Sequence, residues 1–468
     1  MNIDSDYVNS NSTSMDSIDL PKVENVTIGE DEWIELTITI QELVNDILEE
    51  NIIRISNANV YKEITQAVID VLFETLAHLF TDEDEIFEDI QELAEQMVEI
   101  EIERSDIPKR SLTMTLDNLE QQTEEVKLQL ENTIEQLRNI PQPQQKTTEW
   151  YEFRYNLISA SNLWKALGSE AQRNSLIYEK CKPLDIEKIE QSNGNVYGSM
   201  HWGVKYEPVT VQVYEDMYQT KIEEFGCIQH PKYNFIGASP DGINIEPNCN
   251  RFGRMLEIKN IVNREITGIP KTEYWVQTQI QMETCNLDLC DFVETKFNEY
   301  EESDFYEDKT HDYKGVILHF VERPEIENEI LVYKPSFPKY IYKPLSIENK
   351  KKSIDTWVET IKNEQNQDNY ALFSIIYWYM EEFSCVLIER NQKWFENAVK
   401  HIKHTWETIL KERVDGYEHR AAKKRVPKIN VFMDSSSNSY VTNIQKKQST
   451  CLIRLDEEGN IYNNKHDV

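Results

Sequence analysis

The sequence predicts an α/β core that lies between two helical regions of a 468-residue chain. Apolar residues recur at helical spacing within residues 31–140 and again within 346–415. Between them, residues 148–345 mix strand and helix patterns and contain all the motifs that carry chemistry. A chain of this length can bury a large core. We therefore expect a mixed central sheet flanked by helices, with further helices before and after it in the sequence.

Composition divides the chain into five segments. The first is polar and acidic, and we expect it to be disordered because it has too few apolar residues to form a core. Helical runs from Val60 to Leu76 and from Leu116 to Leu137 characterise the second, which Pro141-Gln142-Pro143 ends. The expected segments are a leader (1–28), an acidic helical region (29–140), the core (145–345), a helical C-terminal extension of the core (346–415) and a polar tail with a basic cluster (416–468).

Large aromatic residues recur on helical patterns in the C-terminal extension. We expect them to form a core rather than a platform on which nucleic-acid bases stack. They are Trp357, Trp378, Tyr379, Trp394 and Trp406.

The formal net charge of −35 opposes a nucleic-acid partner unless the charge is localised. Residues 1–149 contain 35 acidic and 9 basic residues, a balance of −26. Subtraction from the totals of 84 and 49 leaves 49 acidic and 40 basic residues in 150–468, a balance of −9. Nucleic-acid binding by the core would therefore need a local basic groove.

Targeting signals and cysteine usage favour an intracellular protein. The sequence has no run of 18 apolar residues, so no membrane span is expected, and Met1 to Ser14 lacks the basic and apolar stretches of a signal peptide. The seven cysteines are scattered, and the closest pair, Cys285 and Cys290, matches no zinc or redox spacing. We expect free thiols in a reducing compartment and no secretion.

The segment Gly237-Ala238-Ser239-Pro240-Asp241-Gly242, followed by Glu257-Ile258-Lys259, is the most informative pattern in the chain. Asp241 is expected at a strand end or turn. Glu257 and Lys259 are expected on one face of a strand, because side chains alternate along it. Two carboxylates beside an ammonium suit a divalent metal that activates water against a phosphodiester. Charged residues make up 28% of the sequence, so a Pro-Asp-Gly turn and an exposed polar strand face remain alternatives.

Three further motifs accompany this pattern in a fixed order along the chain. They are Trp150-Tyr151-Glu152-Phe153-Arg154 with Ile158-Ser159-Ala160-Ser161, then Gly203-Val204-Lys205-Tyr206-Glu207-Pro208, and Tyr274-Trp275-Val276-Gln277-Thr278-Gln279-Ile280-Gln281-Met282. Together the four motifs resemble those of the lambda-exonuclease/YqaJ-type viral recombinase nucleases of the PD-(D/E)XK superfamily, in a form like those of large DNA viruses. The resemblance covers about residues 145–300 and implies a restriction-endonuclease-like core.

The resemblance implies roles for five residues. Asp241, Glu257 and Glu207 would bind one or two Mg²⁺ or Mn²⁺ ions, Lys259 would orient the attacking water, and Gln279 would help to place it. Glu207 is expected near the start of a helix, with Pro208 in the first turn. The alternative is that Glu207 binds no metal and only interacts favourably with the helix dipole. The pattern places Gln279 on a helix face with Trp275 and Met282, whereas Gln277 and Gln281 are expected at the surface.

The resemblance also implies a pocket for a 5′-phosphate. Arg154, Ser161 and Ser239 match its residues, and a guanidinium offers a fork of donors that suits phosphate oxygens. An ion pair of Arg154 with Glu149 or Glu152 is the alternative. For the serines the alternative is helix capping, a role that also suits Ser159.

We therefore expect a metal-dependent DNA nuclease, in the form of a 5′→3′ exonuclease on double-stranded ends in viral recombination, repair or replication. An endonuclease or RNA-processing enzyme on the same site, and a non-catalytic binding scaffold, remain open. The expected partners are duplex DNA ends and, through the acidic N-terminal region, a single-strand annealing or other viral protein. A viral origin would place the protein in the host cytoplasm or nucleus.

Overall fold

The computed structural model describes residues 30–76, 85–104, 110–113, 122–145, 147–185, 199–323, 325–327, 330–332 and 338–422. The described residues up to Arg420 form one compact unit. The leader predicted at 1–28 and most of the predicted tail lie outside the described residues. The division of the chain into five segments stays a prediction.

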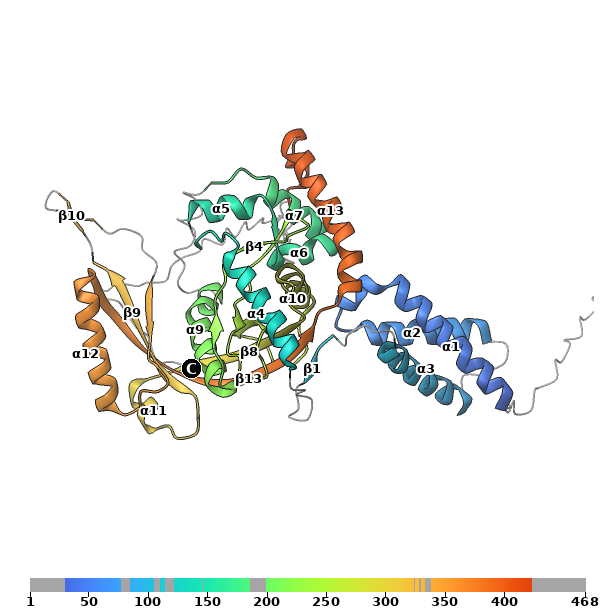
Figure 1. Ribbon diagram of the computed structural model, residues 1–468, viewed down its shortest axis with the longest axis horizontal. Helices are drawn as coiled ribbons and strands as arrows, with labels where there is room; N and C mark the ends of the chain where they lie inside the picture. The colour runs from blue at the N-terminus through green and yellow to red at the C-terminus, as the bar shows by residue number, and fades with distance from the viewer. Residues whose placement is uncertain are drawn as a thin grey trace, which may run out of the picture. The chain divides into compact units, whose positions relative to one another are not determined.

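A mixed sheet lies at the centre of the fold (Figure 1). Only β7 and β8 are parallel among its paired strands, and all its other pairs are antiparallel. The predicted fold class, a mixed sheet flanked by helices, is therefore confirmed. In order across the sheet, the strands are β12 (Lys339–Tyr342), β9 (Lys314–Glu322), β13 (Tyr370–Glu389), β8 (Leu289–Tyr300), β7 (Met255–Ile261), β6 (Gly242–Asn244) and β3 (Ile222–Glu223), and β1 (Leu112–Thr113) pairs with β13.

The longest strand, β13, corrects one prediction. Residues 346–415 were expected to be helical, but β13 occupies the middle of this segment and pairs with both β8 and β9 (Figure 1). Its residues are rich in Ile, Phe, Tyr and Trp, which favour strands, and two neighbouring strands supply hydrogen bonds that local periodicity cannot reveal. Trp378 and Tyr379 therefore lie on a strand, not on a helix. Trp378 is buried, as are Trp394 and Trp406, so the expectation of a core role holds for these three residues.

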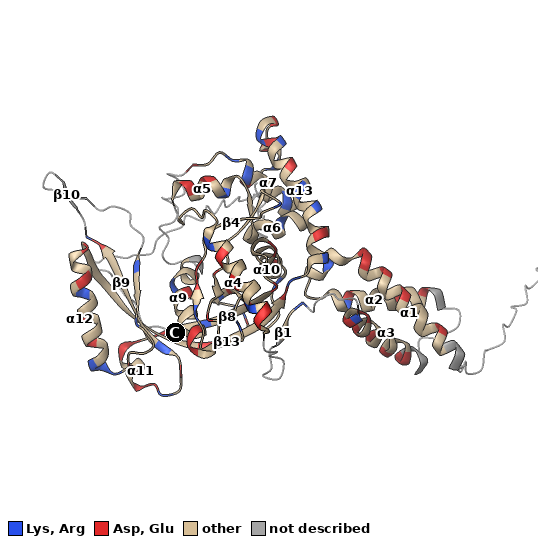
Figure 2. Ribbon diagram, viewed as in Figure 1, with Lys and Arg blue, Asp and Glu red and all other residues tan. Residues whose placement is uncertain are grey.

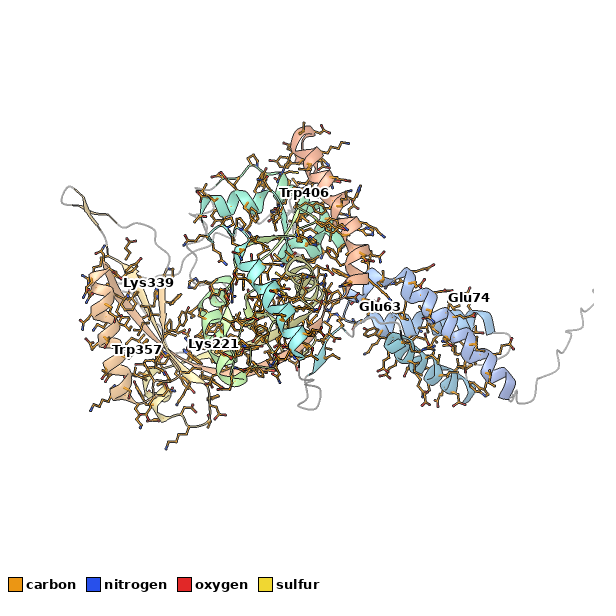
Figure 3. The ribbon with its side chains drawn as sticks, viewed as in Figure 1. Glu63, Glu74, Lys221, Lys339, Trp357 and Trp406 are labelled. Atoms are coloured by element: carbon orange, nitrogen blue, oxygen red, sulfur yellow. The ribbon has the colours of Figure 1, made fainter. Side chains whose placement is uncertain are left out.

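Helices and a second, three-stranded sheet pack against the part of the central sheet that contains β6, β7 and β8. The main hydrophobic cluster joins α6, α7, α10 and α13 to these strands, and Trp406, labelled in Figure 3, belongs to it. The helices are α5 (Thr148–Tyr155), α6 (Ala160–Leu167), α7 (Glu170–Cys181), α9 (Ser199–Tyr218), α10 (Thr272–Cys285) and α13 (Gln392–Asp415), with η3 (Glu418–Arg420) after them, and the small sheet has the order β2 (Ile158–Ser159), β5 (Ile236–Ala238) and β4 (Ile228–Gln229).

The outer end of the central sheet, formed by β12, β9 and the adjoining part of β13, packs against its own helices. Phe320, Leu318 and Val316 on one face of β9 pack against Ile354 and Val358. The additional elements here are α11 (Glu302–Glu307), α12 (Lys351–Gln367) and the pair β10 (Glu325–Glu327) and β11 (Ile330–Val332).

The acidic N-terminal helices have a separate hydrophobic cluster. Acidic residues are spread along these helices (Figure 2). The helix predicted at Val60 to Leu76 is confirmed, whereas Leu116 and Leu119 lie outside the described residues. The elements are α1 (Glu30–Glu50), η1 (Ile52–Ser56), α2 (Val60–Leu76), α3 (Glu85–Arg104) and α4 (Glu124–Asn139).

Parts of this region nevertheless belong to the main core. Ile55, Ile134 and Leu137 are members of its hydrophobic cluster. Two buried indoles also donate to backbone carbonyls of the N-terminal region: Trp394 Nε1 to Ile53 at 3.1 Å and Trp275 Nε1 to Arg110 at 2.9 Å. Among the described helices, none is both long and apolar enough to cross a membrane. The six described cysteines are all free thiols.

Candidate active site

Asp241 and Glu257 are neighbours across two strands. β6 pairs with β7 through Gly242 and Leu256, so the next position in register brings Asp241 opposite Glu257. The ladder ends there, and the Asp241 carboxylate takes the place of a backbone acceptor: its Oδ2 accepts from the N–H of Ile258 at 2.7 Å. Asp241 therefore lies in the turn between β5 and β6, as the sequence predicts, and is held against the open side of β7.

The Glu257 side chain is fully buried and receives three donors. Lys259, on the same face of β7, donates to its Oε1, and Gln277 Nε2 donates to the same oxygen at 2.7 Å. Gln281 Nε2 donates to Oε2 at 2.7 Å and to the backbone oxygen of Ser239 at 3.1 Å. A buried carboxylate needs such partners, and charge-assisted bonds of this kind fix its orientation.

The structure corrects the choice of glutamine. Gln279 is buried away from the carboxylates, where its Nε2 donates to the Glu389 backbone oxygen and its Oε1 accepts from the Asn391 N–H, at 2.8 and 2.7 Å. Gln277 and Gln281, expected at the surface, are the two that contact Glu257. The prediction relied on the helix face that carries Trp275 and Met282. It fails because α10 is buried on nearly all sides, so apolar neighbours do not distinguish one face from another.

Glu207 lies in the middle of α9, not near the start of a helix. The helix begins at Ser199, and Pro208 interrupts its interior, so the placement of this proline in the first turn is wrong. A proline inside a helix costs a hydrogen bond, which the burial of Tyr206 and Val209 against the sheet offsets.

Glu207 nevertheless reaches the two carboxylates. It lines a cleft of about 670 Å³ together with Asp241, Glu257 and Lys259. Cationic side chains lie on the same cleft, so the walls carry both signs of charge. The other lining side chains include those of Asn260, Arg264, Lys271, Tyr274 and Gln277.

The electrostatics of the cleft show crowded negative charge. Burial, and then the charges of Glu257 and Glu207, raises the pKa of Asp241 well above its usual range. Burial alone would lower the pKa of Lys259, but Glu257 and Asp241 outweigh it and raise that pKa above its usual value. The negative charge of the cleft therefore favours a bound cation. The Lys259 ammonium offsets part of this charge, and the raised pKa of Asp241 indicates that a further positive charge would be stabilised there.

The donor set fits a hard divalent cation. Three carboxylates face one cleft, and a bound cation would relieve the repulsion that raises the pKa of Asp241. Within the described ranges, no three acidic, histidine or cysteine side chains are gathered into a ready-made coordination group. A metal held by Asp241, Glu257 and Glu207 would therefore require these side chains to adjust around it.

The residues predicted to bind a 5′-phosphate come from two adjacent segments. Parallel pairing of β2 with β5 aligns Ser159 with Gly237, which brings the Ser161 motif beside the Ser239 motif. Ser159 is the N-cap residue of α6, but its hydroxyl bonds the Ser161 hydroxyl at 3.2 Å rather than capping the helix. The Ser239 hydroxyl is buried without a hydrogen-bond partner among the described atoms, so a ligand oxygen can satisfy it.

Arg154 lies at the end of α5, next to these segments in the chain. Its guanidinium carbon lies 4.5 Å from the centre of the Trp150 ring. In the part of the chain that the structure describes, no carboxylate forms an ion pair with Arg154, so the surface pairing with Glu149 or Glu152 is not found. A stacked guanidinium keeps its edge donors available for an oxyanion.

The sequence argument missed several residues that line the cleft or contact its carboxylates. Gln277 and Gln281 are four residues apart, which places them on one helix face, and that spacing was the available signal. Arg264 and Lys271 gave none, because isolated cations in a loop resemble any surface charge. Arg264 is ion-paired with Glu294.

Residues 149–288 match the model of the YqaJ-like viral recombinase domain. The matched segment includes Arg154, the carboxylates of the cleft and both glutamines that contact Glu257. The predicted resemblance to the YqaJ-type nucleases is confirmed over this segment.

One protein sequence and two crystal structures are also similar to this chain. An uncharacterised protein of Acanthamoeba polyphaga mimivirus is 27% identical over 309 residues, covering 59% of this chain and 54% of the relative, so the chain spans about half of that relative's length. This agrees with the predicted likeness to proteins of large DNA viruses. Crystal structures of an alkaline exonuclease from Laribacter hongkongensis, one of them in complex with dAMP, are 18% identical, with a TM-score of 0.31 and coverage of 58% of this chain and 95% of theirs.

Proposed function

We propose that this protein is a metal-dependent deoxyribonuclease that degrades double-stranded DNA from its ends in the 5′→3′ direction. The observation that supports this most directly is the arrangement of Asp241, Glu257 and Lys259 at the open side of β7, within the segment that matches the YqaJ-like domain. Acidic residues and a lysine around one cleft suit hydrolysis of a phosphodiester.

Each residue of the cleft has a chemical role in this proposal. Asp241, Glu257 and Glu207 would hold Mg²⁺ or Mn²⁺, and the chemistry this ion would supply is polarisation of a phosphoryl oxygen and a lower pKa for a bound water. Lys259 orients the attacking water and offsets charge on the phosphoryl group. Gln277 and Gln281 replace Gln279 in the proposal, because they hold the Glu257 carboxylate in place.

Recognition of the chain end falls to Arg154, Ser161 and Ser239. The unsatisfied Ser239 hydroxyl and the unpaired guanidinium are the donors that a terminal phosphate needs. An enzyme that enters DNA from its ends benefits from such a pocket, whereas an endonuclease does not.

The remaining proposals concern location and partners. We place the protein inside the host cell, in cytoplasm or nucleus, acting in viral recombination, repair or replication. The acidic helices α1 to α3 are a docking surface for a viral protein such as a single-strand annealing protein, because their charge repels DNA.

The test uses the full-length chain and duplex DNA labelled at either end, with and without Mg²⁺. We expect metal-dependent loss of the 5′-labelled end first, faster on 5′-phosphorylated than on 5′-hydroxyl duplex. Arg154→Ala should slow the phosphorylated substrate about tenfold and leave the hydroxyl substrate nearly unchanged, because the charge-assisted contact exists only with the phosphate.

Other outcomes would select another function. Internal cuts in closed circular DNA would indicate an endonuclease, and preferential cleavage of RNA would indicate an RNA-processing enzyme. Complete absence of hydrolysis on every nucleic acid, with intact binding, would indicate a scaffold. Equal slowing of both end types by Arg154→Ala would show that Arg154 is structural.

A further inference from the structure

Four aromatic rings form a continuous row across the outer end of the central sheet. His201 at the start of α9 is followed by Tyr340 on β12, His319 on β9 and Phe373 on β13. Successive ring centres are 5.6, 5.1 and 5.0 Å apart. A hydrogen bond of 2.6 Å between His201 Nε2 and the Tyr340 hydroxyl fixes the first step.

Strand pairing and a bulge create this row. Tyr340 lies directly opposite His319, which places both rings on one face of the sheet. On the other side of β9, the register shifts between Leu372 and Ser374, so the intervening Phe373 has no partner in the ladder. A bulge re-aims the side chain of its extra residue. The result is a phenyl ring that is 68% exposed, although most large apolar side chains of this sheet are buried.

The row lies on the face of the sheet that α9 covers. Ile317, on the same side of β9 as His319, packs with Tyr206 and Val209 of α9, whereas Leu318 and Phe320 face α12. Residues of α9 that follow His201 directly, including Gly203 and Glu207, line the candidate catalytic cleft. The same helix, α9, therefore contributes one ring to the aromatic row and, further along, residues to the lining of the cleft.

The chemistry of the row suits the uncharged faces of nucleic-acid bases. Burial, together with the neighbouring His201 and Lys205, lowers the pKa of His319, so its ring is neutral at neutral pH and offers an uncharged face. Lys205 supplies positive charge near the row, although Glu299 binds it.

We propose that His201, Tyr340, His319 and Phe373 form a stacking platform for an unpaired DNA strand. This proposal rests on the proposed exonuclease, because digestion of one strand from a duplex end leaves the other strand without a partner next to the cleft. Aromatic side chains bind single strands by stacking on successive bases, which every base permits. Phe373, as the most exposed ring, is the outer step, and the row holds the released strand away from the site of cleavage.

The test measures binding without turnover. Full-length Asp241→Asn protein is titrated with a short, fluorescein-labelled oligothymidylate, and then with Phe373→Ala or Phe373→Leu added. We expect Phe373→Ala to weaken binding about tenfold, as loss of one stacked base predicts. Phe373→Leu should weaken it nearly as much, because it keeps the apolar area and removes the ring. Val414→Ala, at another highly exposed apolar side chain on α13, is the matched control and should bind as the parent does.

The outcomes separate this proposal from the proposed function. Unchanged affinity in Phe373→Ala, full recovery in Phe373→Leu, or an equal loss in Val414→Ala would overturn the platform, even if the active chain degrades duplex ends. If the active chain degrades no duplex but the Phe373 effect on oligothymidylate appears, the platform stands and the exonuclease assignment fails. Much tighter binding of an oligouridylate would overturn DNA as the occupant.

Discussion

Gln281, on α10, donates two hydrogen bonds through one amide nitrogen: its Nε2 donates to Glu257 Oε2 at 2.7 Å and to the Ser239 backbone oxygen at 3.1 Å. It thereby joins the strand that carries Glu257 to the loop that carries Asp241. This contact and that of Gln277 fix the rotamer of a carboxylate that has no exposure to water. The two glutamines are positioning residues for Glu257.

The first prediction separates these glutamines from Gln279. Gln277→Ala should lower the nuclease rate about tenfold with little change in melting temperature, because Gln277 is only partly buried and Glu257 keeps two other donors. Gln279→Ala should instead lower the unfolding free energy by about 1–3 kcal/mol, because it leaves the Asn391 N–H and the Glu389 carbonyl without their hydrogen-bond partner.

Nuclease assays and thermal unfolding of the two variants check this prediction. Gln277→Glu is a useful companion, because it keeps the size of the side chain but removes its donor. If Gln279→Ala lost activity at an unchanged melting temperature, the original assignment of Gln279 to the active site would be restored.

The same comparison shows what the sequence can and cannot predict. Asp241, Glu257 and Lys259 were predictable because their relation is local: one turn and one alternating strand decide it. The glutamines were not, because α10 is buried all round and its rotation depends on packing with α6 and β5. β13 was not predictable either, since its pairing with β8 and β9 joins segments that are far apart in the chain.

A second prediction concerns metal binding at Asp241. Asp241→Asn keeps an oxygen that can accept from the Ile258 N–H, so the fold should be retained. It also removes a charge from a crowded group of carboxylates, so the variant in metal-free buffer should melt no lower than the parent chain. Mg²⁺ or Mn²⁺ should raise the melting temperature of the parent chain and not that of Asp241→Asn, because only a state that binds the ion is stabilised by it.

Differential scanning fluorimetry across a series of metal concentrations measures this effect without any substrate. Nuclease activity should disappear in Asp241→Asn and in Lys259→Met. An identical metal response in the parent chain and Asp241→Asn would place the cation elsewhere in the protein.

A third prediction is an acid-sensitive contribution from His230. Burial, and then the charges of Arg390 and Lys232, lowers the pKa of His230 to about 4. The geometry agrees, since its Nδ1 accepts from the N–H groups of Lys232 and Tyr233 and must be unprotonated to do so. The unfolded chain takes up this proton near pH 6.5, before the folded chain does.

Stability from His230 is therefore fully present above about pH 6.5 and is lost as the pH falls toward 4, by roughly 3 kcal/mol in total. His230→Asn keeps a local acceptor for the turn and does not titrate. Denaturant unfolding at several pH values should give a shallower decline between pH 6.5 and 4 for this variant. Parallel declines would show that other groups cause the acid sensitivity.

The last prediction concerns removal of the acidic N-terminal region. Deletion of residues 1–140 would take Ile55, Ile134 and Leu137 from the main core, at about 2 kcal/mol for each buried side chain. It would also leave the buried indoles of Trp275 and Trp394 without their acceptors, at about 1–3 kcal/mol each. These losses approach the entire stability of a typical domain, about 5–15 kcal/mol.

We expect this truncation to be insoluble or to melt far below the full chain, whereas a deletion that ends before Glu30 should keep the melting temperature and the nuclease activity. Expression yield and thermal unfolding of the two truncations decide the matter. A folded, active chain that begins at residue 141 would show that the acidic helices are an independent module.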